Sequence, residues 1–213
     1  MPTAEPTYPA GSAMRLSSRL LDYSERLFVL ALLGWFIARL IPVAGDHASN
    51  ALLLLSETIT ALLIVFRKGG APAASIYAWA IAIVGTCGPL FVIPQGAIVV
   101  PPAIGVLLLS LGLCFSLLAK LSLNRSFGIV AANRGVKVGG PYRFVRHPMY
   151  LGYAAVHLGF LLGHLSTWNV LVYLVTWTAL IMRIGAEEAV LLQDSEYRRY
   201  RAIVRFKLIP GLY

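Results

Sequence analysis

Charged residues are scarce in this sequence. Only 13% of its 213 residues are charged and 58% are hydrophobic, whereas a typical soluble domain has about 25% charged residues. The apolar residues form continuous runs of about 17–23, which is the length that spans a bilayer as a helix. They do not alternate every second residue, as they would in a transmembrane β-barrel. We therefore predict an all-α, polytopic integral membrane protein.

Other signatures are absent or weak. The two cysteines, Cys87 and Cys114, lie inside apolar runs, so they indicate neither a disulfide scaffold nor a zinc knuckle. The first ten residues have no basic residue and no apolar core, which argues against a cleavable signal peptide. There is no phosphate-binding loop, no dinucleotide glycine fingerprint and no HExxH motif. His157 and His164 have no acidic partner nearby in sequence, so we interpret them as core or interface histidines and predict no metal site.

Six apolar runs predict about six transmembrane helices, at about 27–44, 50–66, 73–93, 101–123, 148–163 and 168–184. Residues 1–26 are expected to be a disordered N-terminus followed by an interfacial helix, although a plain extension of the first span is as plausible. Residues 27–123 then hold spans one to four. Residues 124–213 hold a basic loop, spans five and six, and a C-terminal helix.

The basic residues lie in alternate gaps between these runs. In the six-span arrangement, 17 of the 18 lysines and arginines fall on one side of the membrane, and a five- or seven-span arrangement would destroy this asymmetry. Because positive residues stay cytoplasmic, we expect both termini and the polar regions to face the cytoplasm, in a bacterial plasma membrane. The net charge of +9 is therefore assigned to membrane topology and not to nucleic-acid binding.

Spans five and six are expected to form a tight helical hairpin, because only about three residues separate them. The hairpin would return the segment around Arg183 and Glu187 to the membrane face where His147 and Pro148 begin the fifth span. Along that span, small residues recur every four positions and predict a face for close helix contact. They are Ala155, Gly159 and Gly163.

Two ionisable residues, Arg39 and Glu57, lie inside predicted spans. Ionisable groups inside a membrane are by default candidates for function. A structural pairing of Arg39 with Asp46 or with Glu57 is equally plausible from the sequence.

The dipeptide His147-Pro148 is a candidate ligand site. Proline suits the first turn of a helix, and the residue before it is pushed out of the helical region. We therefore expect the amides of Met149, Tyr150 and Leu151 to be free for a carboxylate or phosphate. The alternative is an ordinary helix start whose interfacial side chains anchor the protein in the membrane.

The pair Glu187-Glu188 is a second candidate. Two carboxylates just past a span suit a cationic ligand, but they are also compatible with plain solvation or with pairing to nearby arginines. Arg183 lies one helical turn before Glu187, where it would form an internal ion pair or hold a substrate anion.

The motifs together resemble a known family. They are Gly-Pro-Tyr-Arg-Phe-Val-Arg-His-Pro-Met-Tyr-Leu-Gly at 140–152, Glu-Glu-x-x-Leu-Leu from 187, Tyr-Arg-Arg-Tyr at 197–200 and Leu-Ile-Pro-Gly from 208. This combination resembles the isoprenylcysteine carboxyl methyltransferases, within a wider group of integral membrane methyltransferases that includes phospholipid methyltransferases. The resemblance covers about residues 126–213. One departure is the segment before the last helix, 193–196, which is about two residues shorter than is usual in the family.

The resemblance implies S-adenosylmethionine as cofactor and a lipophilic or lipidated acceptor within the membrane. The implied reaction is O-methylation of a carboxylate, for which a dry site favours loss of both charges. A membrane NADPH-dependent reductase of related architecture and a non-enzymatic scaffold or transporter are the alternatives. Arg183 is implied as the residue that orients the acceptor's carboxylate. The implied cofactor-binding residues are Arg134, Gly135, Val136, Lys137, Tyr142, His147, Pro148, Met149, Tyr150, Glu187 and Glu188.

Overall fold

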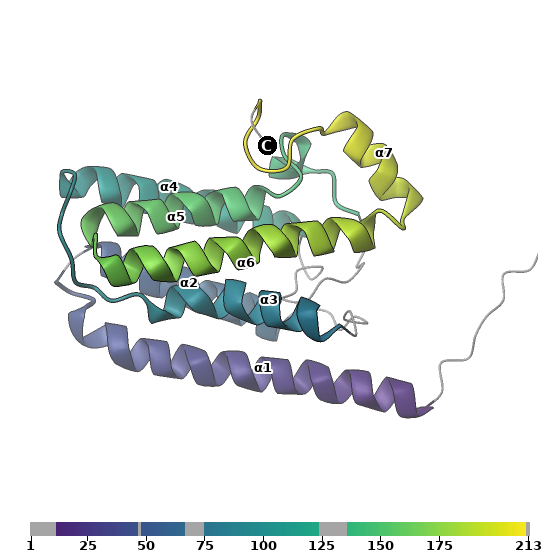
Figure 1. The fold of residues 1–213 in the computed structure, drawn as a ribbon, viewed down its shortest axis with the longest axis horizontal. Helices are drawn as coiled ribbons and strands as arrows, with labels where there is room; N and C mark the ends of the chain where they lie inside the picture. The colour runs from purple at the N-terminus through teal and green to yellow at the C-terminus, as the bar shows by residue number, and fades with distance from the viewer. Residues whose placement is uncertain (1–11, 47, 67–74, 124–135, 212–213) are drawn as a thin grey trace, which may run out of the picture.

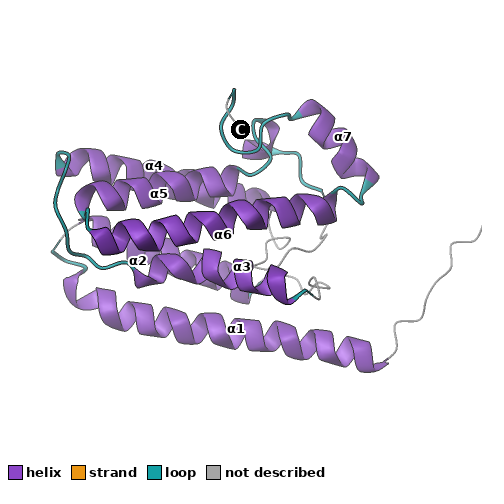
Figure 2. Cartoon of the chain, in the orientation of Figure 1, coloured by secondary structure: helices purple, strands orange, loops and turns teal. Residues whose placement is uncertain are grey.

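The computed structural model describes residues 12–46, 48–66, 75–123 and 136–211. Over these ranges the regular elements are all helices, joined by loops (Figure 2), with one isolated antiparallel bridge between Ala97 and Leu165. The predicted all-α class is confirmed. The α-helices are α1 Ser12–Leu40, α2 Ala48–Val65, α3 Ile76–Cys87, α4 Pro102–Leu123, α5 Pro148–Gly163, α6 Thr167–Leu191 and α7 Ser195–Ile203.

Helices α1 to α6 run alternately back and forth along one direction, and α7 lies at the end where α6 finishes (Figure 1). Within the described ranges, three helices are long and apolar enough to cross a membrane by length and composition, namely α1 from Arg26, α4 and α6. Two shorter apolar helical stretches cover Asn50–Val65 and Ile76–Phe91. The alternation agrees with the predicted order of helices, while the count of six spans stays a prediction.

Two helices extend beyond the apolar runs that predicted them. Helix α1 is continuous from Ser12 to Leu40, so residues 12–25 are helical and join the first apolar run without a break. Whether they lie at the membrane interface stays a prediction. Helix α6 continues past residue 184 to Leu191. Glu187 and Glu188 therefore lie on the same rigid helix as Arg183, which fixes their spacing.

Close packing of α4 on α5 depends on glycine. A Cβ at Gly159 would lie 2.7 Å from the carbonyl oxygen of Gly105, and a Cβ at Gly152 would lie 2.6 Å from Cβ of Ser116. The backbones approach this closely only without side chains between them. The predicted small-residue face is right for Ala155 and Gly159 but wrong for Gly163, where a Cβ would meet nothing within 4 Å, because α5 ends there.

Polar side chains join the helices at the end of the bundle far from α7. Asn169 is fully buried, donates through Nδ2 to the carbonyls of Ile93 and His164 at 3.0 and 2.7 Å, and accepts from the Ile93 amide at 2.9 Å. Arg39 donates to the carbonyls of Leu90 and Val92 at 3.3 and 2.9 Å. The pairings of Arg39 with Asp46 or Glu57 considered from the sequence are therefore wrong: the guanidinium donates to backbone carbonyls in and just after the 3₁₀ turn Gly88–Phe91 that follows α3.

Candidate functional site

Helix α5 begins as its sequence predicts. His147 precedes the helix with φ −126° and ψ 57°, and Pro148 occupies the first turn, where its missing N–H costs nothing. The expectation of three free amides is wrong. The amides of Tyr150 and Leu151 donate to the His147 carbonyl at 3.1 and 3.4 Å, because the residue before a helix accepts the first intrahelical bonds. Of the three, this leaves at most the Met149 amide for a ligand.

The C-terminal segment holds the His147 backbone in place. The amides of Arg146 and His147 donate to the carbonyls of Phe206 and Lys207 at 2.9 and 2.8 Å. The Arg146 guanidinium also donates to the Val204 carbonyl at 2.9 Å. Helix α7 directs this segment back toward α5, and its first residues are fixed by the Asp194 carboxylate, which accepts from the Glu196 amide at 2.8 Å. The register of the last helix, which the shortened 193–196 segment leaves open in the sequence, is thereby defined.

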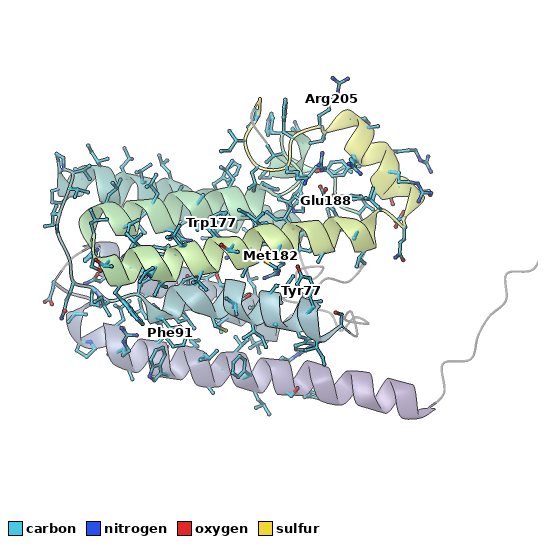
Figure 3. All side chains as sticks on the ribbon, viewed as in Figure 1. Tyr77, Phe91, Trp177, Met182, Glu188 and Arg205 are labelled. Carbon is cyan, nitrogen blue, oxygen red and sulfur yellow. The ribbon has the colours of Figure 1, made fainter. Side chains whose placement is uncertain are left out.

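Glu188 is the centre of a buried ion-pair cluster. Its Oε1 accepts from Nε of Arg146 at 2.7 Å and lies 3.3 Å from Nε2 of His147 and 3.4 Å from the Tyr197 hydroxyl. Lys207 Nζ is 3.8 Å from Oε2. Figure 3 shows Glu188 near the end of α6, below the C-terminal segment that carries Arg205. Glu188 thus connects α6, the start of α5 and the C-terminal segment.

Glu187 points to a different set of groups. Its Oε1 accepts from the Tyr150 hydroxyl at 2.7 Å and from Nε of Arg183 at 3.0 Å. Its Oε2 lies 3.8 Å from Nδ1 of His147, and the side chain keeps 18% of its surface exposed. The start of α5 and the end of α6 therefore meet as the helical hairpin predicts, and the Glu187 side chain stays partly exposed.

The other residues implied for cofactor binding differ in exposure. Pro148, Met149 and Tyr150 are buried in α5, and Tyr142 is buried in a 3₁₀ turn over Gly140–Arg143. Val136 is partly buried and Lys137 is exposed. Arg134 and Gly135 lie outside the described residues.

Three buried tyrosines pack around the start of α5 and stay uncharged. Burial raises the pKa of Tyr142, and also of Tyr197 and Tyr200, above the usual range. Their hydroxyls therefore stay protonated at neutral pH. The Tyr200 hydroxyl donates to the Tyr142 carbonyl at 2.6 Å, which ties α7 to the 3₁₀ turn before α5.

A small polar cavity lies deeper in the bundle, directly beyond Arg183. Its volume is about 20 Å³, enough for about one water molecule. Arg183 connects it to Glu187, because Nη1 of the same guanidinium donates to the Thr86 hydroxyl at 3.0 Å. We call this the inner cavity, and it is lined by Glu57, Thr60, Gly85, Thr86, Pro89, Tyr153, His157, Leu180 and Arg183.

Sequence reasoning missed most of the inner cavity. Glu57 was singled out as an ionisable residue within a span, but Thr60, Thr86 and Tyr153 carry no comparable signal, since hydroxyls are common in membrane helices. From the sequence, Lys120 is one of the basic residues expected at the cytoplasmic face, at the end of the fourth predicted span. The structure instead buries it completely, with Nζ donating to the Thr60 hydroxyl at 2.6 Å and lying 4.8 Å from the Tyr153 ring centre.

Residues 101–196 match the family model of phospholipid methyltransferases. The matched segment includes α4, α5, α6 and the groups around Glu187 and Glu188. The resemblance to membrane methyltransferases drawn from the motifs is confirmed over this segment. Together with the apolar helices, the match indicates an integral membrane methyltransferase. No curated protein and no solved structure matches the chain.

Proposed function

We propose that the chain transfers a methyl group from S-adenosylmethionine to a lipophilic acceptor held between its helices. The observation that supports this most is the meeting of His147 and Tyr150 with Glu187, all within the segment that matches the methyltransferase family. Their positions are fixed by the buried Arg146–Glu188 ion pair behind them.

The residues at the start of α5 suit the proposed cofactor. The partly exposed Glu187 carboxylate is a hydrogen-bond acceptor for an ammonium group or ribose hydroxyls, and the Met149 amide is a donor for a carboxylate. The exposed Lys137, together with Arg134 and Gly135 outside the described residues, would complete the site. When bound, S-adenosylmethionine supplies an electrophilic methyl group on a cationic sulfur.

The finer proposal concerns the acceptor, for which a carboxylate is the first candidate. Arg183 is 4% exposed and lies between Glu187 and the inner cavity, where its guanidinium would orient an anion. A carboxylate and a cationic methyl donor both lose their charge during transfer, so a site that excludes water favours the reaction. No general base is required of the chain in that case.

A second acceptor class is favoured by the family match. A phospholipid methyltransferase acts, by its description, on a phospholipid, and an amine-bearing head group would then be the acceptor. An amine must lose a proton before it can be methylated, which would require a proton acceptor such as Glu57 beside the site.

Calorimetry in detergent with S-adenosylhomocysteine tests the cofactor. We expect saturable binding that Glu187→Ala and His147→Ala each weaken about 10- to 100-fold, the loss expected for a hydrogen bond to a charged group. Glu196→Ala, an exposed carboxylate on α7, is the matched control and should bind as wild type. The proposal would be refuted if the folded wild-type protein did not bind S-adenosylhomocysteine. It would also be refuted if the protein bound NADPH and not S-adenosylhomocysteine.

A labelled-methyl transfer assay against a lipid extract then identifies the acceptor. Base-labile methyl esters among the products would indicate a carboxylate, and base-stable methylamines would indicate an amine head group. Arg183→Ala should lower turnover more than it weakens cofactor binding if the guanidinium orients the acceptor.

A further inference from the structure

Thr86 connects α3 to the candidate site through its hydroxyl. The hydroxyl accepts from Nη1 of Arg183 at 3.0 Å, although the two residues are 97 positions apart in sequence. Other threonines of the bundle use their hydroxyls within their own helix, donating to the carbonyl four residues earlier as hydroxyls in helices commonly do. They are Thr58, Thr176 and Thr178. The Thr86 hydroxyl instead joins two helices.

Two glycines next to Thr86 allow α3 to approach α6 closely enough for this contact. The two helices lie side by side in the bundle (Figure 1). A Cβ at Gly85 would lie 2.9 Å from Cδ2 of Leu180, and a Cβ at Gly88 would overlap the Thr176 hydroxyl. Helices come this close only where no side chain lies between them. The segment 85–88 therefore brings Thr86 within hydrogen-bond distance of α6.

Contacts on different sides hold the plane of the Arg183 guanidinium. Its Nε donates to Glu187 on the next turn of α6 at 3.0 Å, and its Nη1 donates to Thr86 on α3. Its Cζ lies 5.7 Å from the centre of the Tyr150 ring. A guanidinium is planar and points its N–H groups in fixed directions, so the orientation of the plane decides where an anion can bind. Loss of the Thr86 contact would leave that orientation less defined.

The contact between Thr86 and Arg183 lies where polar and apolar surroundings meet. Both residues line the inner cavity. Thr86 also lines an apolar groove between α1 and α3, which has a volume of about 230 Å³ and includes Phe28, Trp79 and Ile83. The guanidinium is therefore held near an apolar surface, which suits an acceptor with a polar reacting group on an apolar body.

We infer that Thr86 is a positioning residue for the proposed reaction: its hydroxyl holds the Arg183 guanidinium in the orientation that meets the methyl acceptor. The inference rests on the proposed function, in which Arg183 contacts the acceptor. Thr86 precedes the segment that matches the family model, residues 101–196. The helices before that segment would then contribute to the reaction as well as to the bundle.

Thr86→Val tests the inference, because it removes the hydroxyl and keeps the shape of the side chain. Turnover is measured as transfer of labelled methyl from S-adenosylmethionine to a lipid extract, with the S-adenosylmethionine concentration varied. We expect turnover at saturating S-adenosylmethionine to fall about 10- to 100-fold, the loss expected for a hydrogen bond to a charged group. The KM for S-adenosylmethionine and the calorimetric Kd for S-adenosylhomocysteine should stay as in wild type, because the acceptor and not the cofactor is affected.

Two further variants are the matched controls. Thr86→Ser keeps the hydroxyl and should restore most of the turnover. Thr178→Val removes an exposed hydroxyl that donates to the Leu174 carbonyl within α6, so its turnover should equal that of wild type.

A double-mutant cycle with Arg183→Ala separates positioning from packing. If Thr86 acts through Arg183, Thr86→Val should cause no further loss of turnover in the Arg183→Ala protein. Thermal unfolding in detergent gives a second readout that does not depend on activity. The Tm of the double variant should fall by less than the sum of the two single decreases.

Wild-type turnover in Thr86→Val, or in Arg183→Ala, would overturn the inference. So would a loss of turnover in the double variant equal to the product of the two single losses, or a loss of S-adenosylhomocysteine binding in Thr86→Val as large as its loss of turnover. If the folded wild-type protein made no methylated product, the proposed function would fail instead. A non-additive Tm would then still show that Thr86 positions Arg183, and an additive one would overturn that as well.

Discussion

Two adjacent glutamates at the end of α6 have different surroundings and therefore different roles. Glu188 is buried and faces Arg146, His147 and Tyr197, so its carboxylate is used within the protein. Glu187 faces Tyr150 and Arg183, and its side chain stays partly exposed. At the level of single residues, one carboxylate holds the site together and its neighbour is available to a ligand.

The different surroundings of Glu187 and Glu188 predict different effects when each is replaced by alanine. Glu188→Ala leaves the buried Arg146 guanidinium without its charge partner, which should destabilise the fold by about 3–5 kcal/mol. Glu187→Ala should lower stability much less and mainly weaken cofactor binding. Thermal unfolding in detergent measures the stability of both variants. The exposed Glu196→Ala is the control and should lie within about 0.5 kcal/mol of wild type. Equal stability of the Glu187 and Glu188 variants would contradict the division.

The sequence predicts which segments meet here but not which atoms pair. The length of the hairpin alone predicts that His147 meets Glu187, because a turn of three residues forces the two helices back to the same face. It cannot show that Arg146 is the main partner of Glu188, since that depends on the C-terminal segment, whose backbone hydrogen bonds orient Arg146. Two of the amides after Pro148 are not free, contrary to the prediction from sequence, because the His147 carbonyl accepts from both.

Among the helices, the contact between α4 and α5 places the start of α5 in the bundle. Gly159→Ala would bring its Cβ to 2.7 Å from the Gly105 carbonyl oxygen and 2.8 Å from the Leu109 amide, so the two helices must separate. We expect a loss of about 1–3 kcal/mol, typical of overpacking, measured as thermal unfolding in detergent. Gly163→Ala, one turn later on the same helix where a Cβ meets nothing within 4 Å, should leave stability unchanged or slightly higher.

The far end of the bundle depends on Asn169. Replacing this buried amide by leucine leaves the Ile93 amide without its acceptor and two carbonyls without their donor. Asn169→Leu should lower the free energy of unfolding by about 1–3 kcal/mol for each of these backbone groups that water cannot reach. The neighbouring Trp168 donates one bond, to the Phe91 carbonyl, from an exposed position, and Trp168→Phe should cost under about 1 kcal/mol. A larger loss of stability in Trp168→Phe than in Asn169→Leu would contradict the central role of Asn169 at this end of the bundle.

The extent of α6 shows where a hydropathy pattern stops being informative. The apolar run ends near Arg183, which marks the end of a predicted span, but Ala186, Glu187, Glu188 and Leu191 all favour helix. The helix therefore continues to Leu191, and this continuation carries the candidate site. The pattern of hydrophobic residues records the membrane boundary and not the end of the helix.

For the whole molecule, a chain of polar contacts leads from the C-terminal segment into the bundle. It runs from Glu188 through His147 and Glu187 to Arg183, and through Thr86 to the inner cavity. The first part joins two motifs about 40 residues apart that the short turn between α5 and α6 brings together, so it was predictable. The last part joins α2 and α3 to α5 and α6, and it depends on how four helices pack, which no local pattern specifies.

The orientation of this molecule in the membrane is the remaining prediction. It can be measured by cysteine labelling, because the chain has only two native cysteines to replace. With Cys87 and Cys114 replaced by serine, single cysteines are introduced at Glu196 on α7 and at Ile98 in the loop before α4, both exposed positions. Helix α7 and that loop lie at opposite ends of the bundle (Figure 1). Because the predicted spans put 17 of the 18 basic residues on the side that carries α7, that end should face the cytoplasm. In intact cells, a membrane-impermeant maleimide should label Ile98→Cys and reach Glu196→Cys only after lysis. The reverse pattern would place the candidate site outside the cytoplasm, away from the cell's supply of S-adenosylmethionine, and labelling of both in intact cells would contradict the alternating arrangement itself.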